Sequence, residues 1–80
     1  MRFSSQDIDW AKALRIFNQG ANFFDENRNV LRMFYPRQYV AIHGRRIVAY
    51  SYNRELLYDF LCKRYGEAVA NTEIYFDKAA

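Results

Sequence analysis

The chain is poor in the residue types that build disulfide-linked, metal-binding and phosphate-binding sites. Its 80 residues include one cysteine, one histidine, one proline and three glycines. A single cysteine excludes an intramolecular disulfide, and one cysteine with one histidine cannot complete a closed zinc site. The glycines stand far apart, which excludes a glycine-rich phosphate loop. We therefore predict no metal and no cofactor.

Long apolar runs are also missing. No stretch approaches the ~20 apolar residues that a membrane-spanning helix needs. The opening residues, MRFSSQDIDW, lack the apolar centre of a secretory signal. The single thiol, Cys62, fits a reducing compartment. We expect a cytoplasmic protein with no membrane partner.

Few residues can act as a base or a nucleophile. The sequence indicates no orienting or activating partner beside any of them. His43 is the one histidine. A general base needs an orienting group, and the sequence places no carboxylate beside His43. Lys63 and Arg64 follow Cys62 directly. These cations suit the last turn of a helix as well as they suit the activation of a thiol. Glu55 and Asp59 have the spacing of a solvated helix face. We predict no catalytic residue and a protein that is not an enzyme.

Aromatic and cationic residues are what the chain has in quantity. Seven Phe, seven Tyr and one Trp make up 19% of it, more than so small a core can hide, and aromatic side chains are enriched in protein interfaces. Nine of the twelve cations are Arg, and residues 28–64 carry a net charge of +6 against a total of +3. Arginine suits planar and stacked contacts. Some of these residues are therefore expected at a binding surface.

The first part of the chain predicts two helices. Ser4 or Ser5 can cap a helix that Gly20 would end. Asn22 can cap a second helix, which Pro36 would end because the residue before a proline avoids the helical region. Asparagines in the middle of this second helix weaken it, so a break there is an alternative.

The stretch from Tyr39 to Tyr50 predicts a β-hairpin, since β-branched and aromatic residues alternate on either side of Gly44. The turn has either His43-Gly44 as its central pair, with His43 at positive φ, or Gly44-Arg45. Both alternatives place Val40, Ile42 and Ile47 on one side of the ribbon. Strict alternation then places Ala49 on the side of Ile47.

A third helix and a short strand complete the chain. Asn53 caps the helix and Gly66 ends it, with Lys63 and Arg64 in its last turn. Its expected buried face consists of Leu56, Leu57, Phe60 and Leu61. The sequence TEIYF, residues 72–76, predicts a strand with Ile74 and Phe76 on one face.

Together these elements predict one α+β domain over residues 1–80, with a helical part over 1–35 and a hairpin–helix–strand part over 36–80. The order is α-α-β-β-α-β. The last strand joins the hairpin in a three-stranded sheet that the helices cover. We expect the two N-terminal helices on the same face as the third helix or at one edge.

The hairpin and the helix after it also carry an ordered set of residues. These are Tyr35, Pro36, Tyr39, Val40, Ala41, Ile42, Gly44, Ile47, Val48, Ala49, Leu56, Leu57, Tyr65 and Gly66. In this order they resemble a small prokaryotic domain family of unknown function, whose members have Tyr-Pro, Tyr-Val-Ala-Ile, a glycine turn, Val-Val-Ala, a Leu-rich helix and a last strand. The chain departs from that pattern at Arg37, where the family has Gly, and at His43, where an acidic residue or Asn is common. The resemblance implies the fold and no activity.

The Arg- and Tyr-rich hairpin region is the candidate binding surface. Its candidate residues are Arg37, Tyr39, Arg45, Arg46, Tyr50, Tyr52 and Arg54. We predict a non-enzymatic protein-interaction module that binds another protein and itself as a homodimer, of the kind that phages and mobile elements encode as accessory or inhibitor proteins. The alternative is a nucleic-acid-binding module, because rings beside cations also suit single strands. The sparse positive charge favours the protein interface.

Overall fold

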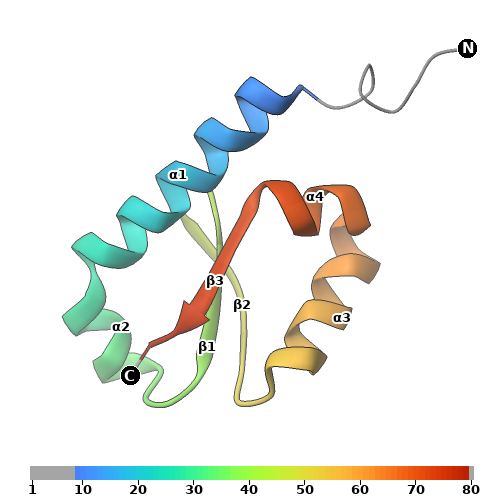
Figure 1. Cartoon of the computed structure of the whole chain (residues 1–80). Coiled ribbons are helices and arrows are strands. Elements are labelled where there is room, and N and C mark those ends of the chain that lie inside the picture. The colour runs from blue at the N-terminus through green and yellow to red at the C-terminus, as the bar shows by residue number, and fades with distance from the viewer. Residues whose placement is uncertain (1–8, 80) are drawn as a thin grey trace, which may run out of the picture.

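The computed structural model describes residues 9–79, which form a three-layered α+β domain (Figure 1). Its elements, in chain order, are α1 (Trp10–Glu26), α2 (Arg28–Phe34), β1 (Tyr39–His43), β2 (Arg46–Ser51), α3 (Arg54–Tyr65), α4 (Glu67–Thr72) and β3 (Ile74–Lys78). The α+β class and the order α-α-β-β-α-β are confirmed. The short helix α4 is an addition that the sequence did not predict.

The sheet has the order β2-β1-β3, and both neighbours of β1 run antiparallel to it. Val40, Ala41 and Ile42 in β1 have no exposed surface. Successive side chains of a strand point to opposite faces, so both faces of the sheet are covered at β1. The strands β2 and β3 form the two edges.

Helices cover opposite faces of this sheet. Phe24 of α1 and Leu31 of α2 pack with Val40 and Ile42 in one core cluster. On the other face, Ala41 packs with residues of α3 and α4 in a second cluster. The expectation that the N-terminal helices share a face with the third helix is therefore wrong, because a central strand that is apolar on both faces needs a helix layer on each.

The hairpin turn consists of Gly44 and Arg45, and the pair His43–Arg46 closes it. Gly44 has φ 68°, whereas His43 does not have a positive φ. The alternative with His43 in the turn is therefore wrong, and the alternative with Gly44 at the first central position holds. As expected, Val40, Ile42 and Ile47 belong to one cluster.

A bulge at Val48 interrupts the alternation of β2. The partners of Ala41 and Ile42 on β2 are Ala49 and Ile47, so Val48 is the extra residue. Val48 and Ala49 both pack on the α3 side, whereas Ile47 packs on the α1 side. The expectation that Ile47 and Ala49 share a face is wrong, because one additional residue shifts every later side chain to the other face.

The helix α1 runs through Gly20, which the sequence had predicted as its end. Gly20 is buried against the sheet, where a Cβ would lie 3.1 Å from Tyr75 Cβ and 3.3 Å from the carbonyl oxygen of Ile42. Its missing side chain thus allows close packing of a helix on a strand. Asp9 caps the helix through its side chain, whereas the predicted caps Ser4 and Ser5 lie outside the described residues.

The predicted second helix is divided between α1 and α2. Asn22 lies inside α1 instead of capping a new helix, and the break falls at Asn27. Asn27 donates from its side-chain amide to the carbonyl oxygen of Phe23, which closes the end of α1. The expected weak middle is therefore confirmed, and α2 ends two residues before Pro36, at Phe34.

The helix α3 begins and ends as predicted but buries a narrower face. Asn53 Oδ1 accepts a hydrogen bond from the Leu56 amide over 3.0 Å, and Gly66 follows the last helical residue. Leu57 and Leu61 are buried, whereas Leu56 and Phe60 are 64% and 47% exposed. The expected four-residue buried face is thus wrong for two of its members, which lie on the flank of α3.

The last strand has the predicted length but starts and ends two residues later. β3 spans Ile74–Lys78 and pairs with β1 along its length. Ile74 and Phe76 lie in the same cluster on the α3 and α4 side, as predicted. Tyr75 points to the α1 side and makes edge-on contacts with the rings of Phe17 and Phe24.

Candidate functional site

The predicted Arg and Tyr candidates do not form one surface. β1 and β2 pair so that His43 meets Arg46 and Tyr39 meets Ser51. The candidates Arg45 and Arg46 are therefore at the turn end of the hairpin. The others, which are Arg37, Tyr39, Tyr50, Tyr52 and Arg54, cluster at or near the opposite end.

At the turn end, one of the two arginines is already engaged. The Arg45 guanidinium pairs with the Glu26 carboxylate and lies 5.3 Å from the centre of the Phe23 ring. Arg46 is exposed. A single remaining cation gives this end little field for binding phosphates.

At the opposite end the candidates differ in exposure. Tyr52 is 70% exposed, and Arg37 is exposed in a loop with φ 64°. Tyr39 is half-buried, and the Lys78 ammonium lies 5.9 Å from the centre of its ring. Arg54 turns away toward β3, where its guanidinium lies 5.0 Å from the centre of the Phe76 ring. These side chains therefore lie on different parts of the surface.

A first hollow, of about 370 Å³, follows the open edge of β2, and we refer to it as the β2-edge groove. It is lined by Val48, Ala49, Tyr50, Ser51, Leu56, Leu57 and Phe60, none of which is charged. Tyr50 and Leu56 are 56% and 64% exposed. The Tyr50 ring is held in place by Tyr35, whose ring centre is 4.8 Å away. An apolar hollow beside an unpaired strand edge is suited to a protein partner.

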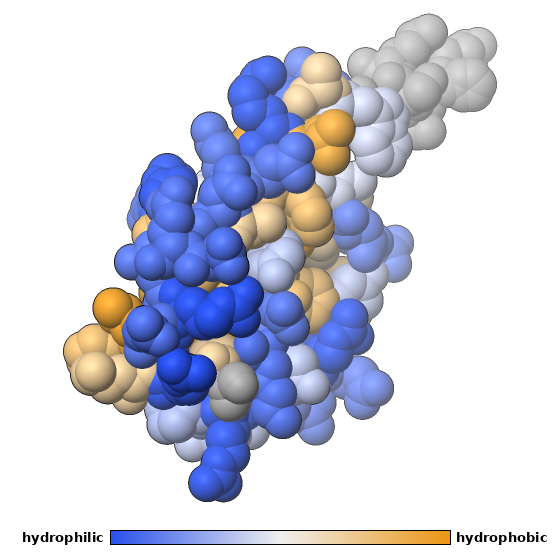
Figure 2. Space-filling model, turned by 60° about the vertical axis from the view of Figure 1, so that its left-hand side comes forward, coloured by the Kyte–Doolittle hydropathy of each residue, from blue (hydrophilic) through white to orange (hydrophobic). Residues whose placement is uncertain are grey.

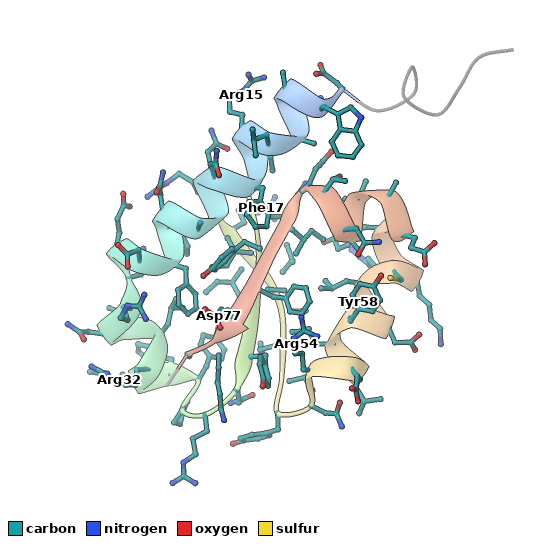
Figure 3. The ribbon with its side chains drawn as sticks, in the orientation of Figure 1. Arg15, Phe17, Arg32, Arg54, Tyr58 and Asp77 are labelled. Carbon is teal, nitrogen blue, oxygen red and sulfur yellow. The ribbon has the colours of Figure 1, made fainter. Side chains whose placement is uncertain are left out.

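A second hollow, of about 440 Å³, lies along the edge of β3, and we refer to it as the β3-edge groove. It is lined by Phe17, Arg54, Tyr58, Ala70, Asn71, Ile74, Tyr75 and Phe76. Figure 3 shows Phe17 reaching it from α1, and Arg54 and Tyr58 from α3. The Tyr58 hydroxyl donates to Asn71 Oδ1 over 2.9 Å. Unlike the β2-edge groove, it combines a cation and polar groups with aromatic walls.

No sequence signal marks the β3-edge groove as a unit. Its residues come from α1, α3, α4 and β3, and only Arg54 was among the predicted candidates. That residue was assigned to the hairpin because of its neighbours in sequence. The fold places it beside Phe76 instead.

Two tyrosines of this groove have perturbed acidity. Burial and the Asp77 carboxylate raise the pKa of Tyr75, whose hydroxyl donates to Asp77 Oδ2 over 3.2 Å. The neighbouring Cys62 side chain is the main cause that raises the pKa of Tyr58. Both phenols therefore keep their protons at neutral pH and present hydroxyl groups to the groove or its rim.

A further exposed apolar group lies on α2. Val30, Met33 and Phe34 are 50%, 73% and 67% exposed. Figure 2 shows apolar atoms at the lower left, separated by hydrophilic atoms from other apolar atoms near the top and in the middle of the same face. This group lines neither of the two hollows and lies on a helix, away from the strand edges.

His43 has a carboxylate partner that the sequence did not reveal. Its Nε2 lies 2.8 Å from Glu73 Oε1, and its ring centre is 5.8 Å from that of Tyr65. Glu73 is distant in sequence, and pairing of β1 with β3 brings the two side chains together. Neither His43 nor Glu73 lines the β2-edge groove or the β3-edge groove, and Cys62 is half-buried in the cluster under α3. The pair therefore lies outside both grooves.

Within residues 9–79, no three His, Cys, Asp or Glu side chains are grouped so that they could hold a metal ion. None of the helices in the same range has the length and apolar character needed to cross a membrane.

Comparisons with known proteins give no further guide. The chain matches no protein-family model. It also matches no curated protein and no solved structure. The resemblance to a prokaryotic domain family of unknown function thus stays a prediction.

Proposed function

We propose that the protein is a non-enzymatic protein-interaction module that associates with itself through the edge of β2. The observation that carries this proposal is the β2-edge groove, where large apolar side chains are exposed beside an unpaired strand. Strand edges offer free backbone donors and acceptors, and pairing with a second strand satisfies them. A second copy supplies such a strand with the same apolar flank.

A two-fold arrangement fits the features of this surface. When β2 pairs antiparallel with β2 of a second copy, the two α3 helices lie on the same face of a continuous sheet and run in opposite directions. Leu56 and Phe60 are one helical turn apart on the exposed flank of α3. In this arrangement, they meet their counterparts over the junction between the strands.

The charges along α3 also suit a second copy. Glu55 and Asp59 lie in its first half, and Lys63 and Arg64 lie in its last turn. Asp59 and Lys63 pair with each other within the helix over 3.1 Å. Because a two-fold axis reverses the second helix, the Glu55 end of each α3 faces the Arg64 end of the other. Such opposition favours this arrangement over one in which like charges meet.

The exposed apolar area is adequate for a dimer interface that includes the strand. The side chains of Tyr50, Tyr52, Leu56 and Phe60 are 56%, 70%, 64% and 47% exposed. At ~200 Å² for a large side chain, these four offer roughly 450 Å² per copy. A standard interface buries about 800 Å² per partner. The backbone of β2 and the polar rim would supply the remainder.

Nucleic-acid binding is the second candidate and has less support. It draws on exposed Tyr52 and Arg37 at one end of the sheet. The other predicted cations are dispersed, and Arg45 is neutralised by Glu26. A groove without charged residues beside β2 favours a protein partner over a phosphate backbone.

Light scattering after size-exclusion chromatography tests the proposal across micromolar concentrations. We expect a dimer for the wild-type chain and a monomer for Leu56→Glu, which places a charge on the apolar flank of α3 that the second copy would cover. Met33→Glu is the matched control, since Met33 is 73% exposed on α2, and it should remain dimeric. A wild-type monomer at every concentration would reject self-association, and equal behaviour of the two variants would reject this surface.

A cytoplasmic location and a role as an accessory or inhibitor protein of a phage or mobile element are part of the same proposal. Both draw on the sequence alone. A small module that pairs with its own copy leaves the opposite edge of each sheet available for another partner.

A further inference from the structure

The edge of β3 differs from the edge of β2 because helices flank it on both sides. α1 packs on β1 and β3, and α4 packs on β3 from the other face. In Figure 1, β3 runs in the foreground between α1 on the left and the α3–α4 pair on the right. The unpaired edge therefore lies at the bottom of the β3-edge groove. Such a recess admits a single extended segment, whereas the helices would collide with those of a whole second domain.

The chemistry of the groove selects for a carboxylate. Arg54 is the one cation among the residues that line it. Its guanidinium lies over the Phe76 ring, 5.0 Å from the ring centre, and no carboxylate within residues 9–79 forms an ion pair with it. A guanidinium without a carboxylate partner can form two parallel hydrogen bonds to one carboxylate.

The other carboxylates near β3 have partners of their own. Asp77 accepts hydrogen bonds from the Tyr75 hydroxyl and from the Lys78 amide. Glu73 pairs with His43. Neither carboxylate forms an ion pair with Arg54. The surrounding Phe17, Ile74 and Tyr75 offer apolar contacts for side chains on either side of the bound carboxylate.

We propose that the β3-edge groove binds an extended acidic segment of another protein. The segment adds a fourth strand beside β3, and one of its Asp or Glu side chains pairs with Arg54. Backbone pairing supplies affinity, and the Arg54 contact supplies selection for acidic sequences. This inference is independent of self-association, because the groove is at the opposite edge of the sheet from β2.

Selection from a displayed library of random peptides, each about ten residues long, tests this inference directly. Peptides enriched on the wild-type protein should carry Asp or Glu flanked by apolar residues. An enriched peptide should bind Arg54→Gln about tenfold more weakly, as expected for the loss of a charge-assisted hydrogen-bonded pair. Arg46→Gln, at an exposed arginine at the edge of the other strand, is the matched control and should bind as the wild type does.

Amide chemical shifts in NMR spectra locate the bound peptide. Saturating peptide should shift the amides of residues 74–78 and leave those of 46–51 in place, in the wild type and in the monomeric Leu56→Glu variant. If Arg54→Gln alters spectra far from the groove, Arg54→Lys replaces it, because it keeps the charge and loses the planar contact. Selected peptides without acidic residues, shifts confined to β2, or a poly-dT strand that shifts β3 would each overturn the inference.

Discussion

Gly20 lies directly against Tyr75, with so little space between them that a Cβ at Gly20 would stand 3.1 Å from Tyr75 Cβ. The contact lets α1 approach β3 closely. It thereby sets the position of Phe17, whose ring meets the Tyr75 ring at 5.5 Å and forms one wall of the β3-edge groove. The absence of a side chain at Gly20 thus allows the close packing of α1 that shapes one wall of the β3-edge groove.

A large side chain at Gly20 should therefore destabilise the fold. Gly20→Leu forces α1 away from β3, and overpacking of this kind costs typically about 1–3 kcal/mol of the free energy of unfolding. Urea denaturation measures the change. Asn22→Leu, at an exposed position of the same helix, should change stability little. Equal stability of Gly20→Leu and the wild type would contradict the close packing.

Arg37 has φ 64°, a left-handed conformation that disfavours residues with a side chain. Glycine takes this conformation without strain, although it adds freedom to the unfolded chain. We expect Arg37→Gly to raise the free energy of unfolding by about 0.5–1 kcal/mol, since relief of a cost of ~1–2 kcal/mol outweighs the added entropy.

Arg15→Gly is the control for this gain. Arg15 is exposed inside α1, where the same change should cost about 1 kcal/mol. Denaturation curves of the two variants should move in opposite directions. If Arg37→Gly lowers stability as Arg15→Gly does, the left-handed conformation at Arg37 is wrong.

The raised pKa of Tyr75 predicts a loss of stability in base. Unfolded chains release the phenol proton around the ordinary pKa of 10.0, whereas the folded chain holds it to higher pH. Above the ordinary value the folded state binds more protons, so the free energy of unfolding falls as pH rises. The stabilising contribution is complete below that range and is lost as pH rises through the folded pKa.

Tyr75→Phe removes the titrating group and should flatten this decline. Urea denaturation of the wild type and the variant between roughly pH 8 and pH 11 measures the two slopes. The comparison with the variant separates Tyr75 from lysines and other tyrosines that titrate in the same range. Parallel curves would show that the acidity of Tyr75 is the same in the folded and unfolded chain.

Signals that act over a few residues were readable from the sequence. Asn53 caps α3, Gly44 forms the hairpin turn and Gly66 follows α3, as predicted. Each depends on hydrogen bonds or backbone angles within one turn of chain. The α+β class follows from the same signals, because the periodicity of apolar residues separates helices from strands.

Features that depend on contacts between distant segments were not readable. Gly20 has the sequence appearance of a helix end, and only the approach of β3 explains it as a packing residue. The bulge at Val48 leaves no mark in an apolar strand. His43 meets Glu73 only because β3 pairs with β1. The helix α4 is six residues long, too short for a clear apolar period.

The sequence predicted the residue types of a binding surface but not where on the fold that surface lies. The sequence indicated a surface rich in Arg and Tyr around the hairpin. In the structure those residues lie apart. Leu56 and Phe60, which helical periodicity assigns to the core, are exposed instead. A stripe of four apolar residues exceeds what a helix on a three-stranded sheet can bury. The surplus at an edge is the observation on which self-association depends.

Hydrogen–deuterium exchange of β2 at two protein concentrations tests self-association through this edge most directly. Concentrations of about 2 µM and about 200 µM bracket the dissociation constants of many weak dimers. We predict that residues 46–51 exchange more slowly at the higher concentration, that residues 74–78 do not change, and that Leu56→Glu abolishes the difference. Exchange of β2 that is independent of concentration, or protection that develops at α2 or β3 instead, would contradict the account.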